Sequence, residues 1–165
     1  MAQSFRLVNR LDVKEIESHS WEADALLALS AAWEDEGSCY GYRRNSPADL
    51  EGRHIFVAVE DGGIAGYLFG RIERSPQARS MMPEGTPCFE LEELYVKPNY
   101  RSMGVGSKLF RYAEERVEAD YILLSAVSRN YRALLHFYLD EMGMELWSAR
   151  LFKPLGEKKE IGEGI

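Results

Sequence analysis

A strand, a glycine-containing loop and an amphipathic helix follow one another in the second half of the chain. The strand is FELEELYV, from Phe89 to Val96, and the helix pattern runs from Gly104 to Ala119 with its apolar residues on one face. A largely apolar run from Tyr121 to Val127 comes next, interrupted only by Ser125, which is typical of a parallel strand covered on both faces. A strand, a helix and a second strand in this order predict a mixed α/β sheet domain.

Shorter patterns predict the other elements of this sheet domain. Ser20 is the expected N-cap of the first helix, and Asp61-Gly62-Gly63 is a hairpin signal. The expected strands are at 5–8, 55–59, 64–71 and 147–152. The expected helices are at 21–36 and 132–142, with a short helix that begins at Ser46, and a loop is expected at 75–87. One domain then covers residues 1–155, and we expect the polar residues 156–165 to form a disordered tail.

Composition and charge exclude several classes of function. The chain has 165 residues, and 20 Lys and Arg against 27 Asp and Glu give a net charge of −7. A nucleic-acid-binding domain usually carries a basic surface, so nucleic acid is not an expected partner. The apolar runs are too short to span a bilayer and the N-terminus lacks the apolar stretch of a secretory signal, so we expect a soluble cytoplasmic protein without a membrane partner. Cys39 and Cys88 stand in no metal-binding spacing, and we expect reduced thiols and no metal.

The loop at residues 97–107 is the most informative segment for function. Its two glycines, Gly104 and Gly106, let the backbone approach a ligand closely, and the first N–H groups of the following helix have no partner within that helix. The helix dipole adds partial positive charge at this end, and Arg101 can add a charge-assisted hydrogen bond. These features predict a site for a phosphate or pyrophosphate.

Two common phosphate loops do not match this segment. A dinucleotide-binding G-x-G-x-x-G would place a glycine at position 109, where the chain has Leu109. A Walker loop needs G-x-x-x-x-G-K followed by Ser or Thr, and the order Gly106-Ser107-Lys108 does not supply it. A nucleotide-binding oxidoreductase is therefore the least favoured function for this chain.

The remaining pattern, R-x-x-G-x-G after a strand that ends in L-x-V, resembles the acyl-coenzyme A pyrophosphate loop of the GNAT superfamily of N-acetyltransferases. The string LEELYVKPNYRSMGVGSKLF is similar to the central motif of that superfamily. Residues 130–144 resemble its N-x-x-A-x-x-x-F-Y-x-x-x-x-G-F signature, with Met144 in place of the last aromatic residue. The likeness covers residues 89 to 147, over a third of the chain. The strings Leu91-Glu92-Glu93 and Phe137-Tyr138 are most similar to the diamine (spermidine/spermine-type) branch.

This resemblance implies a fold and a reaction. The fold would be a predominantly antiparallel sheet with a central parallel strand pair flanked by helices. The reaction would be transfer of an acetyl group from acetyl-CoA, a co-substrate, to the primary amine of a small molecule by direct attack in a ternary complex, with no metal, in a homodimer. Two alternatives remain: acetylation of a peptide or protein amine, and a non-catalytic acyl-CoA-binding module that regulates a partner.

The resemblance also assigns the cofactor contacts. The pantetheine arm would lie along the backbone of the strand end, with an N–H near Val96 facing the thioester oxygen. The glycine loop would hold the pyrophosphate. The residues expected to bind the cofactor are Leu94, Tyr95, Val96, Arg101, Ser102, Met103, Gly104, Val105, Gly106, Ser107 and Asn130.

Acetyl transfer to an amine requires a base and an acid. An alkylammonium has a pKa of about 10.4, so a protein group must take its proton before attack. Resemblance makes Glu92 that base, through a water, with Glu90 and Glu93 in reserve, and strand alternation predicts that Glu92 and Glu93 lie on opposite faces. Tyr138 is the expected acid for the departing thiolate. The structural alternatives are an ion-paired carboxylate at Glu92 and a core aromatic at Tyr138.

An acidic and aromatic stretch near the end of the first helix is the expected acceptor region. Carboxylates and aromatic rings suit a cationic amine through ion pairing and cation–π contact. The residues expected to contact the acceptor are Trp33, Glu34, Glu36 and Tyr40. A solvated helix end explains the acidic residues equally well.

Overall fold

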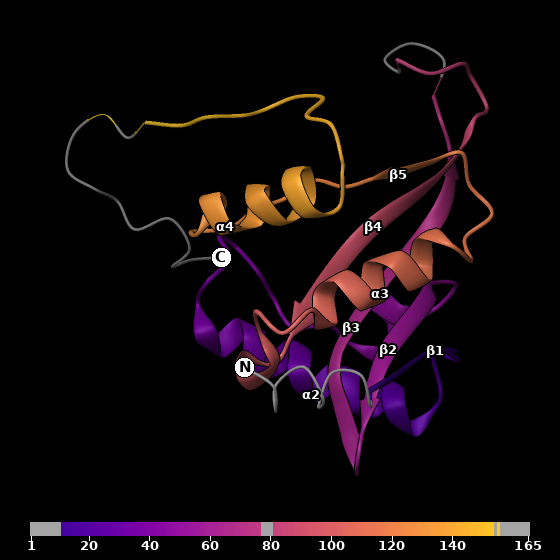
Figure 1. The fold of residues 1–165 in the computed structure, drawn as a ribbon, viewed down its shortest axis with the longest axis vertical. Helices are drawn as coiled ribbons and strands as arrows, with labels where there is room; N and C mark the ends of the chain where they lie inside the picture. The colour runs from indigo at the N-terminus through magenta and orange to yellow at the C-terminus, as the bar shows by residue number, and fades with distance from the viewer. Residues whose placement is uncertain (1–10, 77–80, 154, 156–165) are drawn as a thin grey trace.

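The computed structural model describes residues 11–76, 81–153 and 155, which form a five-stranded sheet with helices on both faces (Figure 1). The strands are β1 (Asp12–Ile16), β2 (His54–Glu60), β3 (Gly63–Arg74), β4 (Pro87–Val96) and β5 (Tyr121–Leu123). The helices are α2 (Trp21–Glu36), α3 (Val105–Glu114) and α4 (Tyr131–Leu135), and α4 continues into a π-helical turn at His136–Glu141. Single 3₁₀ turns lie at Pro47–Leu50 and Pro98–Tyr100.

The sheet has the strand order β1-β2-β3-β4-β5, and only the pair of β4 and β5 is parallel. The predicted mixed, predominantly antiparallel α/β sheet is therefore confirmed. The parallel pair lies at one edge of the described sheet and not at its centre. The reason is that residues 147–152, predicted as a closing strand, form no strand in the structure.

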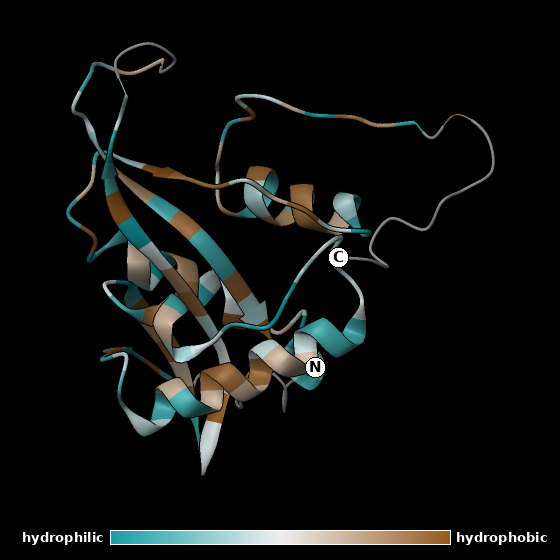
Figure 2. Cartoon of the chain, turned by 180° about the vertical axis from the view of Figure 1, so that it is seen from behind, coloured by the Kyte–Doolittle hydropathy of each residue, from teal (hydrophilic) through white to brown (hydrophobic). Residues whose placement is uncertain are grey.

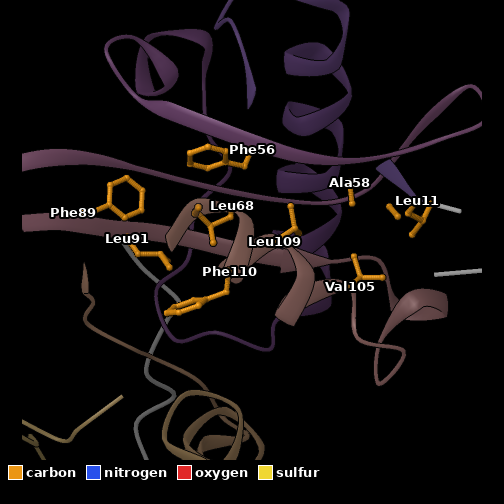
Figure 3. Packing of buried hydrophobic residues seen from close by; sticks show 11 residues of the cluster. Leu11, Phe56, Ala58, Leu68, Phe89, Leu91, Val105, Leu109 and Phe110 are labelled. Carbon is orange, nitrogen blue, oxygen red and sulfur yellow. The ribbon is translucent and has the colours of Figure 1, made fainter. Parts of the chain in front are cut away.

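Two apolar clusters fill the two faces of the sheet. One cluster packs α3 against the sheet, and Figure 3 shows Leu109 and Phe110 of this helix among Leu68, Phe89 and Leu91 of β3 and β4. The other cluster packs α2 against the opposite face. Strands β2 and β3 are covered by both clusters, which explains their nearly continuous apolar sequences.

Several predicted elements are confirmed, together with the caps and turns that bound them. The helix α2 has the predicted bounds, and the Ser20 hydroxyl accepts a hydrogen bond from the Ala23 N–H at 3.3 Å. Gly37 ends this helix in the left-handed conformation, with φ of 61°. The turn after Glu60 joins β2 and β3 as an antiparallel hairpin, and Ser46 begins a 3₁₀ turn with a capping box.

Other boundaries differ from the prediction for identifiable reasons. The helix α3 ends at Glu114 and not at 119, but Val117 and Ala119 still pack on the core from the following turn, so the apolar pattern continues past the helix. Only Tyr121–Leu123 of the predicted strand at 121–127 pairs with β4, because the two strands diverge after this point. The predicted helix at 132–142 is α4 and its π-helical turn.

Some predictions fall on residues that the structure does not describe. These are the strand at 5–8, the tail at 156–165 and part of the predicted loop at 75–87, namely 77–80. The first described strand is β1, which the sequence did not predict because only two of its five side chains are even partly buried. Among the described residues, no helix is long and apolar enough to cross a membrane.

Candidate active site

A β-bulge in β4 brings two carboxylates to one cavity. Phe69 of β3 lies opposite Glu93, but the next residue, Gly70, lies opposite Leu91, so Glu92 is an extra residue in β4. The prediction that Glu92 and Glu93 lie on opposite faces is wrong for this reason. Both line a cavity of about 250 Å³, together with Asn45, Asp49, Arg53 and Phe69.

A glycine in β3 marks this bulge in the sequence. A Cβ atom at Gly70 would lie 2.2 Å from the carbonyl oxygen of Glu90, so no side chain fits there. Glycine inside a strand often indicates a bulge or a close approach of two backbones. Gly70 was therefore a sequence signal against the prediction that Glu92 and Glu93 lie on opposite faces of the strand.

Two arginines surround the Glu92 carboxylate. The Arg53 Nε lies 2.6 Å from Glu92 Oε2, and the Arg71 Nε lies 3.5 Å from Glu92 Oε1. The structure thus places Glu92 in the ion pair that the sequence left open as its structural alternative. The reserve residue Glu90 lies opposite Arg71, and burial and the neighbouring Glu73 raise the pKa of its carboxyl.

Three donors converge on one oxygen of Glu93. Its Oε2 accepts hydrogen bonds from the Tyr67 hydroxyl at 2.9 Å, the Asn45 side-chain amide at 2.9 Å and the Tyr42 hydroxyl at 3.1 Å. Burial raises the pKa of Glu93, while these three hydrogen bonds oppose the shift. The network extends to Ser30, whose Oγ lies 2.6 Å from the Tyr42 hydroxyl oxygen.

Sequence reasoning did not identify Asn45, Tyr42 or Tyr67 as site residues. Tyr67 gave the one usable signal, because a tyrosine in the middle of an apolar strand needs a hydrogen-bond partner for its hydroxyl. Its side chain is fully buried, and burial beside Glu93 raises the pKa of its hydroxyl. Asn45 and Tyr42 lie between helices, where no periodicity indicates a function.

The divergence of β4 and β5 opens a second cavity, of about 330 Å³. After Glu90 and Leu123 the two strands no longer pair, and α4 lies on the far side of the opening. This cavity is lined by Trp33, Ser38, Leu94, Tyr95, Val96, Arg101, Ser128, Asn130, Ala133 and Leu134. It therefore brings together five of the residues predicted to bind the cofactor and one predicted to contact the acceptor.

The glycine loop connects this second cavity to α3. Gly104 is the N-cap of α3 with φ of 89°, and Ser102 also has a positive φ, of 58°. Gly106 has a different requirement, since a Cβ atom there would lie 3.4 Å from the ring of Phe137. The loop thus presents the first-turn N–H groups of α3, which have no partner within the helix, beside the π-helical turn after α4.

Arg101 is held by the end of α2 and by β4. Its Nη2 lies 2.9 Å from both carboxylate oxygens of Glu36, and its Nε donates to the Val96 carbonyl at 2.9 Å. The Tyr95 hydroxyl also donates to Glu36, at 2.5 Å. Glu34 forms an ion pair with Arg44. Glu34 and Glu36, both predicted to contact the amine acceptor, are thus each paired with an arginine of this chain.

Packed aromatic rings connect the Glu93 hydrogen-bond network to the second cavity. The ring of Trp33 lies 4.1 Å from that of Tyr42 and 5.3 Å from that of Tyr95, between ring centroids. The Tyr95 and Tyr67 rings lie 5.9 Å apart. Trp33 thus contacts the second cavity directly and the Glu93 network through Tyr42.

Tyr138 and Tyr40 are among the predicted residues that line neither cavity. Tyr138 is half-buried in the π-helical turn, with its ring centroid 6.3 Å from that of Phe110, and burial raises the pKa of its hydroxyl to about 12. Tyr40 lies against the guanidinium of Arg129, 4.4 Å from its ring centroid, and 5.9 Å from the ring of Phe152.

Comparisons with known proteins assign the chain to a family. Residues 11–144 match the model of the acetyltransferase (GNAT) family. No curated protein sequence matches, whereas 228 chains of solved structures do. One is an aminoglycoside acetyltransferase from an uncultured soil metagenomic sample, solved with trehalose, with a TM-score of 0.65 and 16% identity over 90% of this chain and 98% of that one.

Two further structures have the same fold. A second aminoglycoside acetyltransferase from an uncultured soil sample has a TM-score of 0.64 and 19% identity over 88% of this chain and 99% of that one. A Trypanosoma brucei acetyltransferase has a TM-score of 0.59 and 18% identity over 88% of this chain and 99% of that one. The match to the family over most of the chain shows that this protein belongs to the acetyltransferase (GNAT) family and is an N-acetyltransferase.

Proposed function

We propose that this enzyme transfers an acetyl group from acetyl-CoA to the primary amine of a small molecule by direct attack in a ternary complex. One observation carries the proposal: consecutive residues of β4 line both cavities. Glu92 and Glu93 face the first cavity, and Leu94, Tyr95 and Val96 line the second. An acyl donor in the second cavity and an amine in the first would therefore meet at one strand.

The second cavity has the groups that coenzyme A requires. The edge of β4 that faces β5 has no strand partner after Glu90 within the described residues, so a pantetheine arm can bind along it as an additional strand does. The first turn of α3 offers N–H groups and a favourable dipole to the pyrophosphate, and Arg101 lies beside it. When bound, acetyl-CoA supplies the activated thioester.

The first cavity has the groups that an amine acceptor requires. It contains three carboxylates and one arginine, and that arginine, Arg53, is paired with Glu92. The expectation that Glu92 is the base stays a prediction. The contacts favour Glu93, which accepts hydrogen bonds from two tyrosine hydroxyls and an amide, whereas Glu92 is paired with Arg53. Burial raises the pKa of Glu93, which increases its affinity for a proton taken from an ammonium or through a water.

Tyr138 is the proposed acid. With a pKa of about 12 its hydroxyl stays protonated across the neutral range, as a donor to a departing thiolate must. The ring of the preceding residue, Phe137, lies close to the glycine loop, since a Cβ atom added at Gly106 would lie 3.4 Å from it. This proximity supports a place for Tyr138 near the donor.

The acceptor class is tested by an amine panel in which thiol release is recorded. Polyamines represent the diamine branch, and aminoglycosides represent the acceptors named for two of the similar structures. Amino acids and peptides complete the panel, and a reaction without amine measures hydrolysis. Release with a small amine above that control supports the proposal. Release with peptides alone favours the peptide alternative, and coenzyme A binding without release favours a regulatory module.

A further inference from the structure

A serine hydroxyl is fully buried in the middle of α2. Hydrophobic residues predominate in this part of the helix (Figure 2), which packs against one face of the sheet. Ser30 lies within it, with 0% of its surface exposed. A hydroxyl buried without hydrogen bonds costs free energy, so its presence among apolar residues requires polar partners. The partners are Tyr42 and Asn45, the same two residues that donate hydrogen bonds to Glu93.

The hydrogen bonds of Ser30 determine the direction of its own proton. Its Oγ accepts from the Asn45 backbone N–H at 2.8 Å and from the Asn45 side-chain amide at 3.0 Å. A serine hydroxyl has two lone pairs and one proton, so these two hydrogen bonds use both lone pairs. The remaining contact, at 2.6 Å from the Tyr42 hydroxyl oxygen, is therefore a hydrogen bond that Ser30 donates to Tyr42.

Tyr42 transmits this direction to Glu93. Because its oxygen accepts from Ser30, its own proton is donated to Glu93 Oε2, which lies 3.1 Å away. Burial raises the pKa of Tyr42 to about 12, so this hydroxyl keeps its proton across the neutral range. A hydroxyl that accepts a hydrogen bond is also polarised into a stronger donor. Ser30 therefore acts on Glu93 through Tyr42.

The two carboxylate oxygens of Glu93 are not equivalent, because Oε2 accepts all three hydrogen bonds from Tyr42, Tyr67 and Asn45. A proton added to Oε2 would displace one of these donors, whereas a proton added to Oε1 leaves all three in place. We propose that Ser30 is a positioning residue for Glu93: it directs the Tyr42 hydroxyl onto Oε2 and so reserves Oε1 for the proton of the acceptor ammonium. This transfer leaves a neutral amine and a neutral carboxyl, and the inference rests on the proposed role of Glu93 as the base.

Several other groups also act on the protonation of Glu93. Burial raises its pKa, and the hydrogen bonds from Asn45, Tyr67 and Tyr42 oppose this shift. The titratable and charged groups that surround it come from four parts of the chain: Cys39 and Tyr42 after α2, Asp49 and Arg53 before β2, Tyr67 in β3, and Glu92 in β4. Ser30→Ala leaves all of these groups in place, so a change in the pKa of Glu93 in this variant reports the loss of the serine hydroxyl.

The pKa of the Glu93 carboxyl, measured by carbon-13 NMR on the full chain without substrate, tests this inference independently of acetyl transfer. Glu93→Gln identifies the signal. Hydrogen bonds to a carboxylate lower its pKa, so Tyr42→Phe should raise the pKa of Glu93 by about 1 unit. Ser30→Ala should raise it by about half a unit, since it weakens this donor without removing it. Ser30→Cys keeps a similar shape with a weaker donor and should shift the pKa in the same direction. When Tyr42→Phe is already present, Ser30→Ala should add no shift, and an equal shift with and without Tyr42→Phe overturns the inference.

Ser20→Ala is the matched control for the loss of a serine hydroxyl from the same helix. It removes the N-cap hydrogen bond from Ala23 and should lower the melting temperature without moving the pKa of Glu93. Kinetics separate the inference from the base assignment, because the acidic limb of kcat/KM should move to higher pH in Ser30→Ala by the same amount as the carboxyl pKa. A shifted carboxyl pKa with an unmoved limb contradicts Glu93 as the base. An unmoved carboxyl pKa in Ser30→Ala overturns the positioning role of Ser30.

Discussion

Glu92 and Glu93 are adjacent in sequence, and the bulge in β4 directs both carboxylates into one cavity. Their environments nevertheless differ. Glu92 is paired with two arginines, whereas Glu93 accepts hydrogen bonds from two tyrosine hydroxyls and an amide. One strand thus presents an anchored anion beside a carboxyl that burial makes a stronger base.

Paired glutamine variants should distinguish the two carboxylates. Glu93→Gln should lower kcat by a factor of about 10², the lower end of the range for general base catalysis, and remove the acidic limb of the pH profile of kcat/KM. Glu92→Gln removes a neighbouring charge that raises the pKa of Glu93, so it should shift this limb to lower pH. If Glu92→Gln abolishes the limb and Glu93→Gln keeps it, Glu92 is the base.

The raised pKa of Glu93 predicts a pH-dependent stability. A carboxyl whose pKa is higher in the folded than in the unfolded state binds more protons when folded, so its contribution to stability falls as the pH rises from about 4.5 through the raised value. Glu93→Gln does not undergo this loss. The melting temperature of the variant relative to the wild type should therefore rise between pH 4.5 and pH 8, in thermal scans at both pH values. A difference that is constant with pH would contradict the assignment.

Tyr138→Phe should affect the chemical step and leave donor binding intact. The ring packs in the core beside Phe110, so phenylalanine keeps the packing and removes only the hydroxyl. We expect kcat to fall at least about tenfold and the Kd for coenzyme A to change less than twofold, since an acid for the leaving group acts in the transition state. Steady-state kinetics and calorimetry on the same preparation measure both quantities. Full turnover would show that Tyr138 has only a packing role.

The conformation of Gly104 should be required for donor binding. Its φ of 89° is strained for any side chain, so Gly104→Ala should destabilise the fold by about 1 kcal/mol and also weaken coenzyme A binding. Gly62 has a similar φ of 76° in the hairpin between β2 and β3, and Gly62→Ala is the matched control. Both variants should lower the melting temperature, and only Gly104→Ala should raise the Kd. An equal Kd for coenzyme A in both variants would contradict a role of this loop in donor binding.

The parts of the fold that local signals determine could be predicted from the sequence. Ser20 and Gly37 bound α2 because capping is a property of a few adjacent residues, and the strand, loop and helix around Gly104 follow for the same reason. Parts that depend on distant segments were not predictable. The ion pairs of Glu36 with Arg101 and of Glu92 with Arg53 join residues that are far apart in the chain.

Residues 147–152 illustrate a second limit. Their alternation predicts a strand, but they pair with no strand among the residues that the structure describes, and a strand exists only where another strand pairs with it. The sequence pattern indicates the capacity for pairing and does not identify the partner. Residues 124–127 show the same effect on a smaller scale, since this largely apolar segment continues the β5 sequence after the pairing with β4 has ended.

Calorimetric titration with coenzyme A tests the central claim most directly, because every proposed role depends on the cavity between β4 and α4 holding the donor. We expect one coenzyme A to bind per chain. Arg101→Ala should weaken this binding by a factor of about 10 to 100, since a charge-assisted hydrogen bond contributes about 1.5–3 kcal/mol. If the wild-type chain binds neither coenzyme A nor acetyl-CoA, the assignment of this cavity is contradicted.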